Sequence, residues 1–576
     1  MAALEGKTSK KRSATDANIK TEANKNKAQK SAKTGKPNGA SKFQKKGSAN
    51  GDKPAVDFKL QRKMNRPHYE VVKRAKEIWN IIRERDVEKT KRTQLVEELF
   101  HLVSGKIYDV AAKHDASRVI QSLLKFGTPA QRTSVIQELQ PQLLELAKLQ
   151  YGCFLVTKML KYGSKEDRAL IVREMTGNVV KLATHNVAAN MLESAHEYLQ
   201  PRQLSGLKLE FYGKEFAYFK SEMEDKKKTL ADIIDHSPSK KEEILTHVAD
   251  LLNRMVDKQL LGLAFVQALM LEYLTVASTE RINAMVPNIR DAAVALLATR
   301  AGAKVVVICL SVGTPKDRKR IIKTLKDKVF EACNHISGYL VLLRILDVVD
   351  DTVLVQKSIL SELHSHWLDV ALHQNGSKVL LQLLSPLNSK YFGPEEIQLL
   401  QPPMVDDNGE QVVNYKKDPQ VRRNELWKGL KSTIETMCSE NAAALLRSKS
   451  GGHVLFEVVK QADNEDLTAA VFDAVMNEEA QDGVEPLFAD SLAHKQLQRL
   501  IGIESFGKAL LEALTKPAIN TWAKTNRGSF VLLAFVKEQV AGASAALKKA
   551  LDVKKLSATE KALAGTKLLL EKLELA

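Results

Sequence analysis

The amino-acid sequence predicts an all-α fold, an α-solenoid of about eleven helical repeats in two halves, preceded by a disordered basic tail. From residue 67 onward, apolar residues recur at spacings of three and four, which is the period of an amphipathic helix. No run shows the strict alternation that is typical of a half-buried strand. Similar segments also recur every 36 residues, which indicates that one helical unit is used many times.

Residues 1–66 form the predicted tail. They hold 18 Lys and Arg against 5 Asp and Glu, so +13 of the chain's net charge of +18 lies there. Large apolar residues are scarce in this stretch, so it cannot bury enough surface to offset the entropy of ordering. Its basic clusters predict nuclear localisation signals or phosphate contacts, at Lys10, Lys11, Arg12, Lys45 and Lys46. The alternative is a tail that serves solubility alone.

Residues 67–385 are predicted to form the first set of repeats. Three segments of ten residues align without gaps and start at Ala116, Gly152 and Ala188, which are 36 residues apart each time. In the first two, Gly127 and Gly163 follow soon after the apolar stripe, where a glycine in the left-handed conformation can end a helix. The pattern therefore predicts helix, stop and helix at a fixed period.

Weaker copies of the same segment continue to residue 545. Each copy opens with small residues and continues with an aliphatic stripe, and the starts are Gly302, Ser337, Gly376, Gly451 and Gly528. Less certain copies lie near Lys214, Leu263 and Lys495. Residues 386–421 interrupt the series with a polar, proline-containing stretch, which we interpret as an insertion loop between two repeats. It predicts either a joint between the two halves or an inert loop, and residues 422–576 are predicted to hold the remaining repeats and capping helices.

Several classes of function find no support in the sequence. The four cysteines lie far apart without a CxxC pair, so neither a disulfide framework nor a zinc site is predicted. The densest histidine group, His364, His366 and His373, lacks the spacing of a zinc hydrolase. No phosphate-binding glycine loop and no membrane-spanning apolar run occur. We therefore expect no cofactor, no membrane partner and no enzymatic activity, and we expect a monomer.

The segment Ala116-Ser-Arg-Val-Ile-Gln121, repeated at 36 residues, resembles the second helix of Pumilio repeats. The insertion YFGPEEIQLLQPP and the following KKDPQVRRNELWKGL are similar to the divergent Puf-A, or penguin, branch of that superfamily. The resemblance implies that each repeat places two side chains on the edge of an RNA base and one on its face. In the first repeat, Ser117 and Gln121 match the edge pair and Arg118 matches the stacking residue, a combination suited to adenine.

The base-reading pattern weakens in later repeats. Cys153 and Thr157 surround a stacking Phe154 in the second repeat, and the third keeps the polar Asn190 and Glu193 beside Ala189. The edge position is then apolar in the weaker copies, at Val307, Leu342, Leu381, Phe456 and Leu533. An apolar side chain cannot pair with a base edge, so we expect no readout of an eight-base site.

Positive charge persists along the same helices and predicts contacts with nucleic-acid phosphates. The candidate residues are Lys113, Lys125, Lys158, Lys161, Lys304, Lys378, Lys524 and Arg527. For any one of them alone, the alternative is a lysine or arginine that merely solvates the surface of the solenoid.

These observations lead to a sequence-tolerant RNA-binding protein, with DNA as a further ligand because phosphate contacts do not choose between the two. The resemblance implies a nuclear and nucleolar role on pre-ribosomal RNA and with pre-ribosomal proteins during large-subunit assembly. Two other hypotheses stay open. One is a protein–protein scaffold in which the later apolar positions form a groove, and the other is a regulator of mRNA translation that reads bases with the first three repeats.

Overall fold

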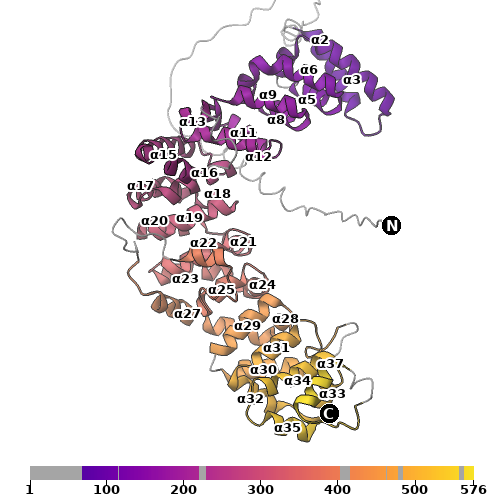
Figure 1. Cartoon of the computed structure of the whole chain (residues 1–576), viewed down its shortest axis with the longest axis vertical. Coiled ribbons are helices and arrows are strands. Elements are labelled where there is room, and N and C mark those ends of the chain that lie inside the picture. The colour runs from indigo at the N-terminus through magenta and orange to yellow at the C-terminus, as the bar shows by residue number, and fades with distance from the viewer. Residues whose placement is uncertain are drawn as a thin grey trace, which may run out of the picture. The chain divides into compact units, whose positions relative to one another are not determined.

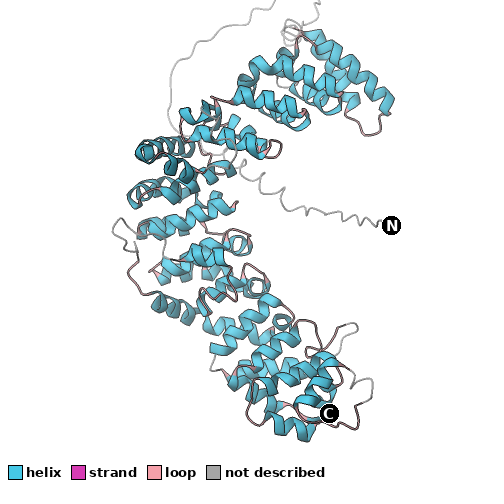
Figure 2. Cartoon of the chain, in the orientation of Figure 1, coloured by secondary structure: helices cyan, strands magenta, loops and turns pink. Residues whose placement is uncertain are grey.

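The computed structural model of the protein describes residues 68–113, 116–218, 229–401, 415–461, 464–477, 484–556 and 563–575. Within these ranges the chain forms helices and turns, without a strand (Figure 2), which confirms the all-α prediction. Contacts group Pro67–Ala576 into one compact unit. The predictions for residues 1–66, including the clusters at Lys10, Lys11, Arg12, Lys45 and Lys46, fall outside the described residues.

A ladder of inner helices runs through this unit (Figure 1), because the helices that carry the repeated segment pack against one another in chain order, with the third and fourth linked by hydrogen bonds of Glu193. These inner helices are α5 (Ser117–Phe126), α8 (Gly152–Tyr162), α11 (Ala188–Ala195), α16 (Ala264–Val276), α19 (Arg300–Val312), α22 (Tyr339–Val348), α25 (Ser377–Leu384), α29 (Lys449–Gln461), α31 (Ala493–Ile501) and α34 (Asn526–Lys537). The first three begin within one residue of the predicted starts, and the predicted α-solenoid of repeats is therefore confirmed.

The remaining helices flank or connect the inner ones. The flanking helices are α6 (Pro129–Leu139), α9 (Lys165–Met175), α12 (Pro201–Lys208), α15 (Lys241–Asp257), α17 (Thr279–Ile289), α20 (Pro315–Thr324), α23 (Thr352–Ser358), α27 (Pro419–Glu440), α30 (Glu465–Asn477), α32 (Glu504–Ala513) and α35 (Ala543–Ala550). Short connecting helices are α4 (Ile107–Ala111), α7 (Leu143–Lys148), α10 (Val179–Ala183), α13 (Lys214–Tyr218), α14 (Leu230–His236), α18 (Ala293–Leu296), α21 (Val329–Asn334), α24 (Trp367–Leu372), α28 (Ala442–Leu446) and α33 (Lys516–Ala523).

The two ends of the ladder are closed by additional helices. At the start, α2 (Tyr69–Ile82) and α3 (Lys89–Val103) pack on α5. At the end, α37 (Ala564–Lys572) packs on α34, and Thr566 on α37 shares a buried hydrogen bond of 2.9 Å with Ser529. Such capping helices cover the apolar face that a terminal repeat would otherwise expose. None of the helices in the described ranges combines the length and the apolarity needed to cross a bilayer.

Hydrogen bonds between a glutamate and the backbone of the preceding repeat join neighbouring 36-residue units. Both oxygens of Glu138 accept backbone N–H groups of the preceding repeat, from Gly105 at 2.9 Å and Ile107 at 2.8 Å. Two repeats later, buried Glu210 does the same with Gly177 at 2.7 Å and Val179 at 3.0 Å. Gly105 and Gly177 both have positive φ angles, 74° and 82°, which glycine adopts without a steric penalty. One carboxylate thus fixes the turn and the helix start of its neighbour.

The glycines that end α5 and α8 have a backbone conformation other than the predicted one. Gly127 and Gly163 have extended backbones with φ of −65° and −67°, so the left-handed helix end predicted for them is wrong. A Cβ at Gly127 would lie 2.6 Å from the carbonyl oxygen of Leu123, so lack of space explains the glycine. The next helix starts directly in a capping box, made by Thr128 with Gln131 in the first of these repeats.

The insertion differs from the predicted loop over residues 386–421 in two ways. It contains a short helix, α26 (Pro394–Leu400), and α27 already begins at Pro419. It also lies within one repeat, between inner helix α25 and its flanking helix α27, while α25 packs directly on α29. Proline at the first position and a Glu396 carboxylate that accepts the Gly393 N–H at 2.7 Å start α26. The ladder is therefore continuous across the insertion.

We expect Glu210→Ala to destabilise the protein by about 1–3 kcal/mol, because two backbone N–H groups, of Gly177 and Val179, lose their acceptor. Thermal unfolding followed by circular dichroism measures the change. Glu512→Ala, at an exposed position on α32, is the control and should change stability by less than about 0.5 kcal/mol. Equal unfolding midpoints for the two variants would contradict the role of the carboxylate.

Candidate nucleic-acid interface

The first three repeats expose the side chains at the predicted stacking position. These are Arg118 on α5, Phe154 on α8 and Asn190 on α11, one from each of three helices packed in succession. Phe154 is 57% exposed, and Arg118 is exposed without an ion pair to another described residue. The Asn190 amide donates a hydrogen bond of 2.9 Å to the Asn186 carbonyl. We call Arg118, Phe154 and Asn190 the N-terminal row.

Two of the predicted edge-reading side chains point into the protein. Ser117 is fully buried, and its hydroxyl donates to the Tyr151 carbonyl at 3.2 Å. Cys153 is 5% exposed, and its thiol donates to the Gln150 carbonyl at 3.3 Å. The structure therefore does not support the reading of a base edge by either residue.

The other polar groups at edge positions also have partners inside the chain. Half-buried Gln121 donates to the Ser117 hydroxyl at 3.3 Å, and Thr157 donates to the Cys153 carbonyl at 3.0 Å. Glu193, at the third such position, accepts the N–H groups of Ala264 and Phe265 at 3.0 and 3.2 Å. This carboxylate links α11 to the start of α16, which is a structural task. Base reading by Gln121 and Thr157 remains a prediction.

The basic residues of α5 and α8 lie close to the N-terminal row. Lys158 and Lys161 follow Phe154 by one and two helical turns, so they share its face of α8. On α5, Lys125 likewise follows Arg118 by two helical turns and shares its face of the helix. Lys125, Lys158 and Lys161 form no ion pair with an acidic side chain in the described ranges, and their ammonium groups lie 4.8–5.9 Å from the rings of Phe126 or Tyr162. Their charge is thus available, whereas Lys113 is half-buried before α5.

The basic residues predicted in later repeats are mostly neutralised. Lys304 pairs with Glu395 at 2.6 Å, Lys378 pairs with Glu396 at 2.6 Å, and Arg527 pairs with Glu485 at 2.5 Å. Lys524 is exposed, with no acidic partner in the part of the chain that the structure describes. Phosphate binding by Lys304, Lys378, Lys524 and Arg527 stays a prediction. The ion pairs make it less favourable for Lys304, Lys378 and Arg527.

The two carboxylates from α26 are held in their charged form. A hydrogen bond from Lys304 lowers the pKa of Glu395. Burial by itself would raise the pKa of Glu396, but the hydrogen bonds from Lys378, the Tyr339 hydroxyl and the Gly393 amide outweigh it and leave that pKa below its ordinary value. The pairs are therefore ionic at neutral pH.

The later edge positions belong to the hydrophobic core. Val307, Leu342, Leu381 and Leu533 are each at most 3% exposed, and Phe456 is half-buried. The prediction that these positions form a protein-binding groove is therefore wrong. They stabilise the ladder, and at the edge position they offer neither a hydrogen bond for a base nor an open apolar surface for a peptide.

Two family models match this chain. The Pumilio-family RNA binding repeat matches residues 116–140 and 142–176, which contain α5, α6, α8 and α9. The CPL (NUC119) domain matches residues 372–509, from the end of α24 into α32, and so includes the insertion.

Similar proteins extend over most of the chain. Human Pumilio homolog 3 is 32% identical over 547 residues, which cover 90% of this chain and 83% of that protein. The chain belongs to the Pumilio homolog 3 family. The member from Danio rerio is 33% identical and matches 83% of this chain and 77% of its own length. The crystal structure of human Puf-A superimposes with a TM-score of 0.79 at 31% identity, and covers 88% of this chain and 100% of that one. The resemblance inferred from the repeats is thus confirmed.

Sequence reasoning missed a set of histidines that start inner helices in this Pumilio homolog 3 family member. The His335 Nδ1 accepts the N–H groups of Ser337 and Gly338, each at 3.2 Å. His373 accepts those of Asn375 and Gly376 in the next repeat, at 3.2 and 3.3 Å. The signal was a histidine two or three residues before these two repeated segments, and only the hydrogen bonds explain it.

We expect Glu396→Gln to lower the stability at pH 7 by about 1–3 kcal/mol, because a buried ion pair becomes a neutral contact. Since the folded-state pKa of Glu396 is below the ordinary 4.5, its charged form stabilises the fold above that pH, and this contribution is lost as the pH falls through the folded pKa. The gap in unfolding midpoint between wild type and variant should shrink below about pH 4.5. Glu395→Gln, at a more exposed position, should have a smaller effect. A gap that is independent of pH would argue against the ionic pair.

Proposed function

We propose that this chain captures single-stranded RNA, and DNA as a further ligand, through the N-terminal row and the basic residues beside it, with little dependence on base sequence. The observation that carries this proposal is the contrast within α5 and α8. The stacking residues Arg118 and Phe154 are exposed, whereas the edge positions Ser117 and Cys153 are buried. Of the lysines beside them, Lys125 and Lys161 are exposed and Lys158 is half-buried. A base can lie on Phe154 or on the guanidinium plane of Arg118 whatever its identity, because every base has a π face.

The charges support the same conclusion. Lys125, Lys158 and Lys161 can contact phosphates, which supply affinity without a sequence code and make it depend on salt. Human Puf-A has been crystallised in complex with DNA, and the matching repeat family is described as RNA binding. A ligand held through stacking and phosphates can be either polymer, because neither contact requires the 2′-hydroxyl.

The proposal also includes a role in the nucleolus, which the family resemblance supports. We propose that the target is pre-ribosomal RNA during large-subunit assembly and that the basic tail directs nuclear import. Replacing Lys10, Lys11, Arg12, Lys45 and Lys46 with Gln in a fluorescent fusion tests the tail. Unchanged nuclear accumulation would remove this part of the proposal.

Regulation of mRNA translation is the function to test against it, because that role needs one preferred RNA sequence. Fluorescence anisotropy with purified protein, several unrelated single-stranded RNAs, a hairpin RNA and duplex DNA, over a range of salt, separates the two. Similar affinities for the single strands with a common steep salt slope support backbone capture. One strongly preferred RNA would favour base reading, and no binding at low salt would refute nucleic-acid binding altogether.

We expect Phe154→Ala to weaken binding of unrelated single-stranded RNAs to a similar extent, by about 1–3 kcal/mol, because each loses one stacked base. The measurement is the same anisotropy titration. Ile336→Ala is the matched control, since Ile336 is also a large apolar residue, 72% exposed, outside the N-terminal row. Equal affinities for both variants would show that Phe154 does not stack on the nucleic acid.

A further inference from the structure

The insertion, over the residues that the structure describes, lies on the side of the inner helices that carries the stacking positions. Residues Lys390–Gln401, which we call the covering segment, contact α19, α22, α25 and α29 through hydrogen bonds, ion pairs and ring contacts. Aligned with the N-terminal row, the stacking positions of these four helices are Lys304, Tyr339, Lys378 and His453, which we call the covered row.

The two glutamates of the covering segment contact three of the helices and neutralise cations on two of them, α19 and α25. Glu395 pairs with Lys304 at 2.6 Å and with Arg300 at 3.3 Å, both on α19. Glu396 pairs with Lys378 on α25 and accepts the Tyr339 hydroxyl of α22. The side chains of Lys304 and Lys378 are only 27% and 17% exposed as a result.

The aromatic end covers the fourth helix. The ring of Tyr391 lies 5.0 Å from the ring of His453, at an interplanar angle of 50°, and its hydroxyl donates to Glu457. The Lys390 ammonium lies 4.6 Å from the ring of Phe456, at the edge position of the same repeat. Burial first, and then the positive charges of Arg499, Lys449 and Lys390, lower the pKa of His453 to about 4, so the ring is neutral at pH 7.

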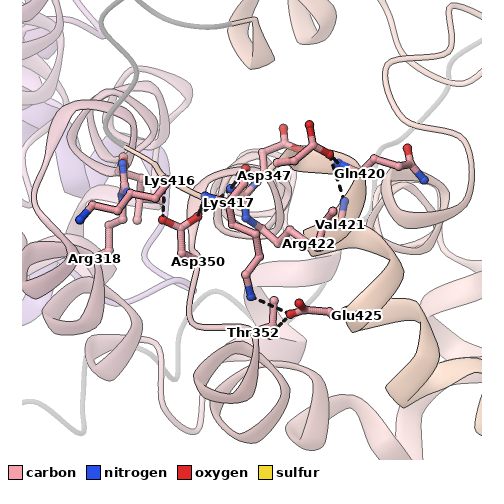
Figure 3. Close-up of polar contacts among 12 residues, drawn as sticks. Arg318, Asp347, Asp350, Thr352, Lys416, Lys417, Gln420, Val421, Arg422 and Glu425 are labelled. Atoms are coloured by element: carbon pink, nitrogen blue, oxygen red, sulfur yellow. Dashed lines mark hydrogen bonds and ion pairs between the residues drawn. The ribbon is translucent and has the colours of Figure 1, made fainter.

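Hydrogen bonds at its C-terminal end hold the covering segment in place, and a second set of contacts holds the chain after residue 415. Buried Arg344 on α22 donates to the carbonyls of Leu400 and Gln401 at 2.8 and 3.2 Å. Where the chain returns toward α27, Asp350 accepts the backbone N–H groups of Lys416 and Lys417, and its carboxylate pairs with Arg422 at 2.8 Å (Figure 3).

The covering segment therefore offers the groups that a nucleic acid would offer. Two carboxylates meet the cations as phosphates would, and a tyrosine ring meets a stacking position as a base would. Building on the proposed function, we propose that this segment is a built-in occupant of the nucleic-acid-binding face. It confines capture to the N-terminal row and conceals a latent polyanion site formed by Arg300, Lys304 and Lys378.

The test uses full-length protein and single-stranded oligouridylate RNA containing photoreactive 4-thiouridine. The variant Glu395→Gln/Glu396→Gln removes the two carboxylates, and Glu242→Gln/Asp291→Asn is the matched control. Glu242 and Asp291 are exposed and pair with Arg281 and Arg320 at 2.6 and 2.8 Å, so the control loses equal charge and two ion pairs away from the inner face. Circular dichroism verifies that both variants are folded.

In the wild type we expect crosslinks on α5 and α8 and none on α19 or α25. The Glu395→Gln/Glu396→Gln variant should add crosslinks on α19 and α25, and its log–log salt slope should steepen by about 2, since three cations become available at about 0.7 each. The control should match the wild type. If the wild type binds and the variant has the same slope and crosslinks, the inference fails while the proposed function stands. If neither binds, both fail.

A second measurement needs no variant. Acylation of wild-type lysines with an N-hydroxysuccinimide ester, followed by mass spectrometry without nucleic acid, should modify Lys304 and Lys378 much more slowly than exposed Lys524. Equal rates would mean that the segment does not cover the row in solution, which overturns the inference even if the variant were unfolded.

Discussion

The structure depends on the packing of each inner helix between its two neighbours. A single repeat cannot bury an apolar stripe by itself, so every inner helix directs its aliphatic residues toward the adjoining repeats. In α5 this places Val119, Ile120, Leu123 and Leu124 inside the protein and leaves Arg118 and Lys125 outside. The same packing that stabilises the ladder therefore determines which side chains a ligand can reach.

This constraint explains why base stacking and base-edge reading differ in this chain. The residue one position before the stacking residue is buried in the first two repeats, where the Ser117 hydroxyl bonds to the Tyr151 carbonyl of the next repeat and the Cys153 thiol bonds to the Gln150 carbonyl of its own. In later repeats even the second edge position is aliphatic and buried, as at Val307 and Leu381. These repeats have buried aliphatic side chains in place of the polar groups that could distinguish one base from another.

Electrostatics divides the inner helices into two groups. The lysines of α5 and α8 have no acidic partners among the described residues, whereas those of α19 and α25 pair with carboxylates from α26. A buried carboxylate between a lysine and a tyrosine hydroxyl is stable only because each lost hydration contact is replaced. Two glutamates of the insertion thus change the electrostatic character of two inner helices, α19 and α25.

The sequence by itself determined the helical class and the 36-residue period of the first repeats, because apolar spacing is a local property and each repeat buries the same stripe. That the ladder continues across the insertion was decided by the packing of α25 on α29. The resemblance of Ser117–Gln121 to a Pumilio repeat could also be recognised from the sequence alone. Only the tertiary structure decided which of those residues are exposed, since exposed Arg118 lies between buried Ser117 and Val119. The pairing of Glu395 with Lys304 was out of reach of any sequence pattern, because the two residues are 91 positions apart and meet only when α26 folds back onto α19.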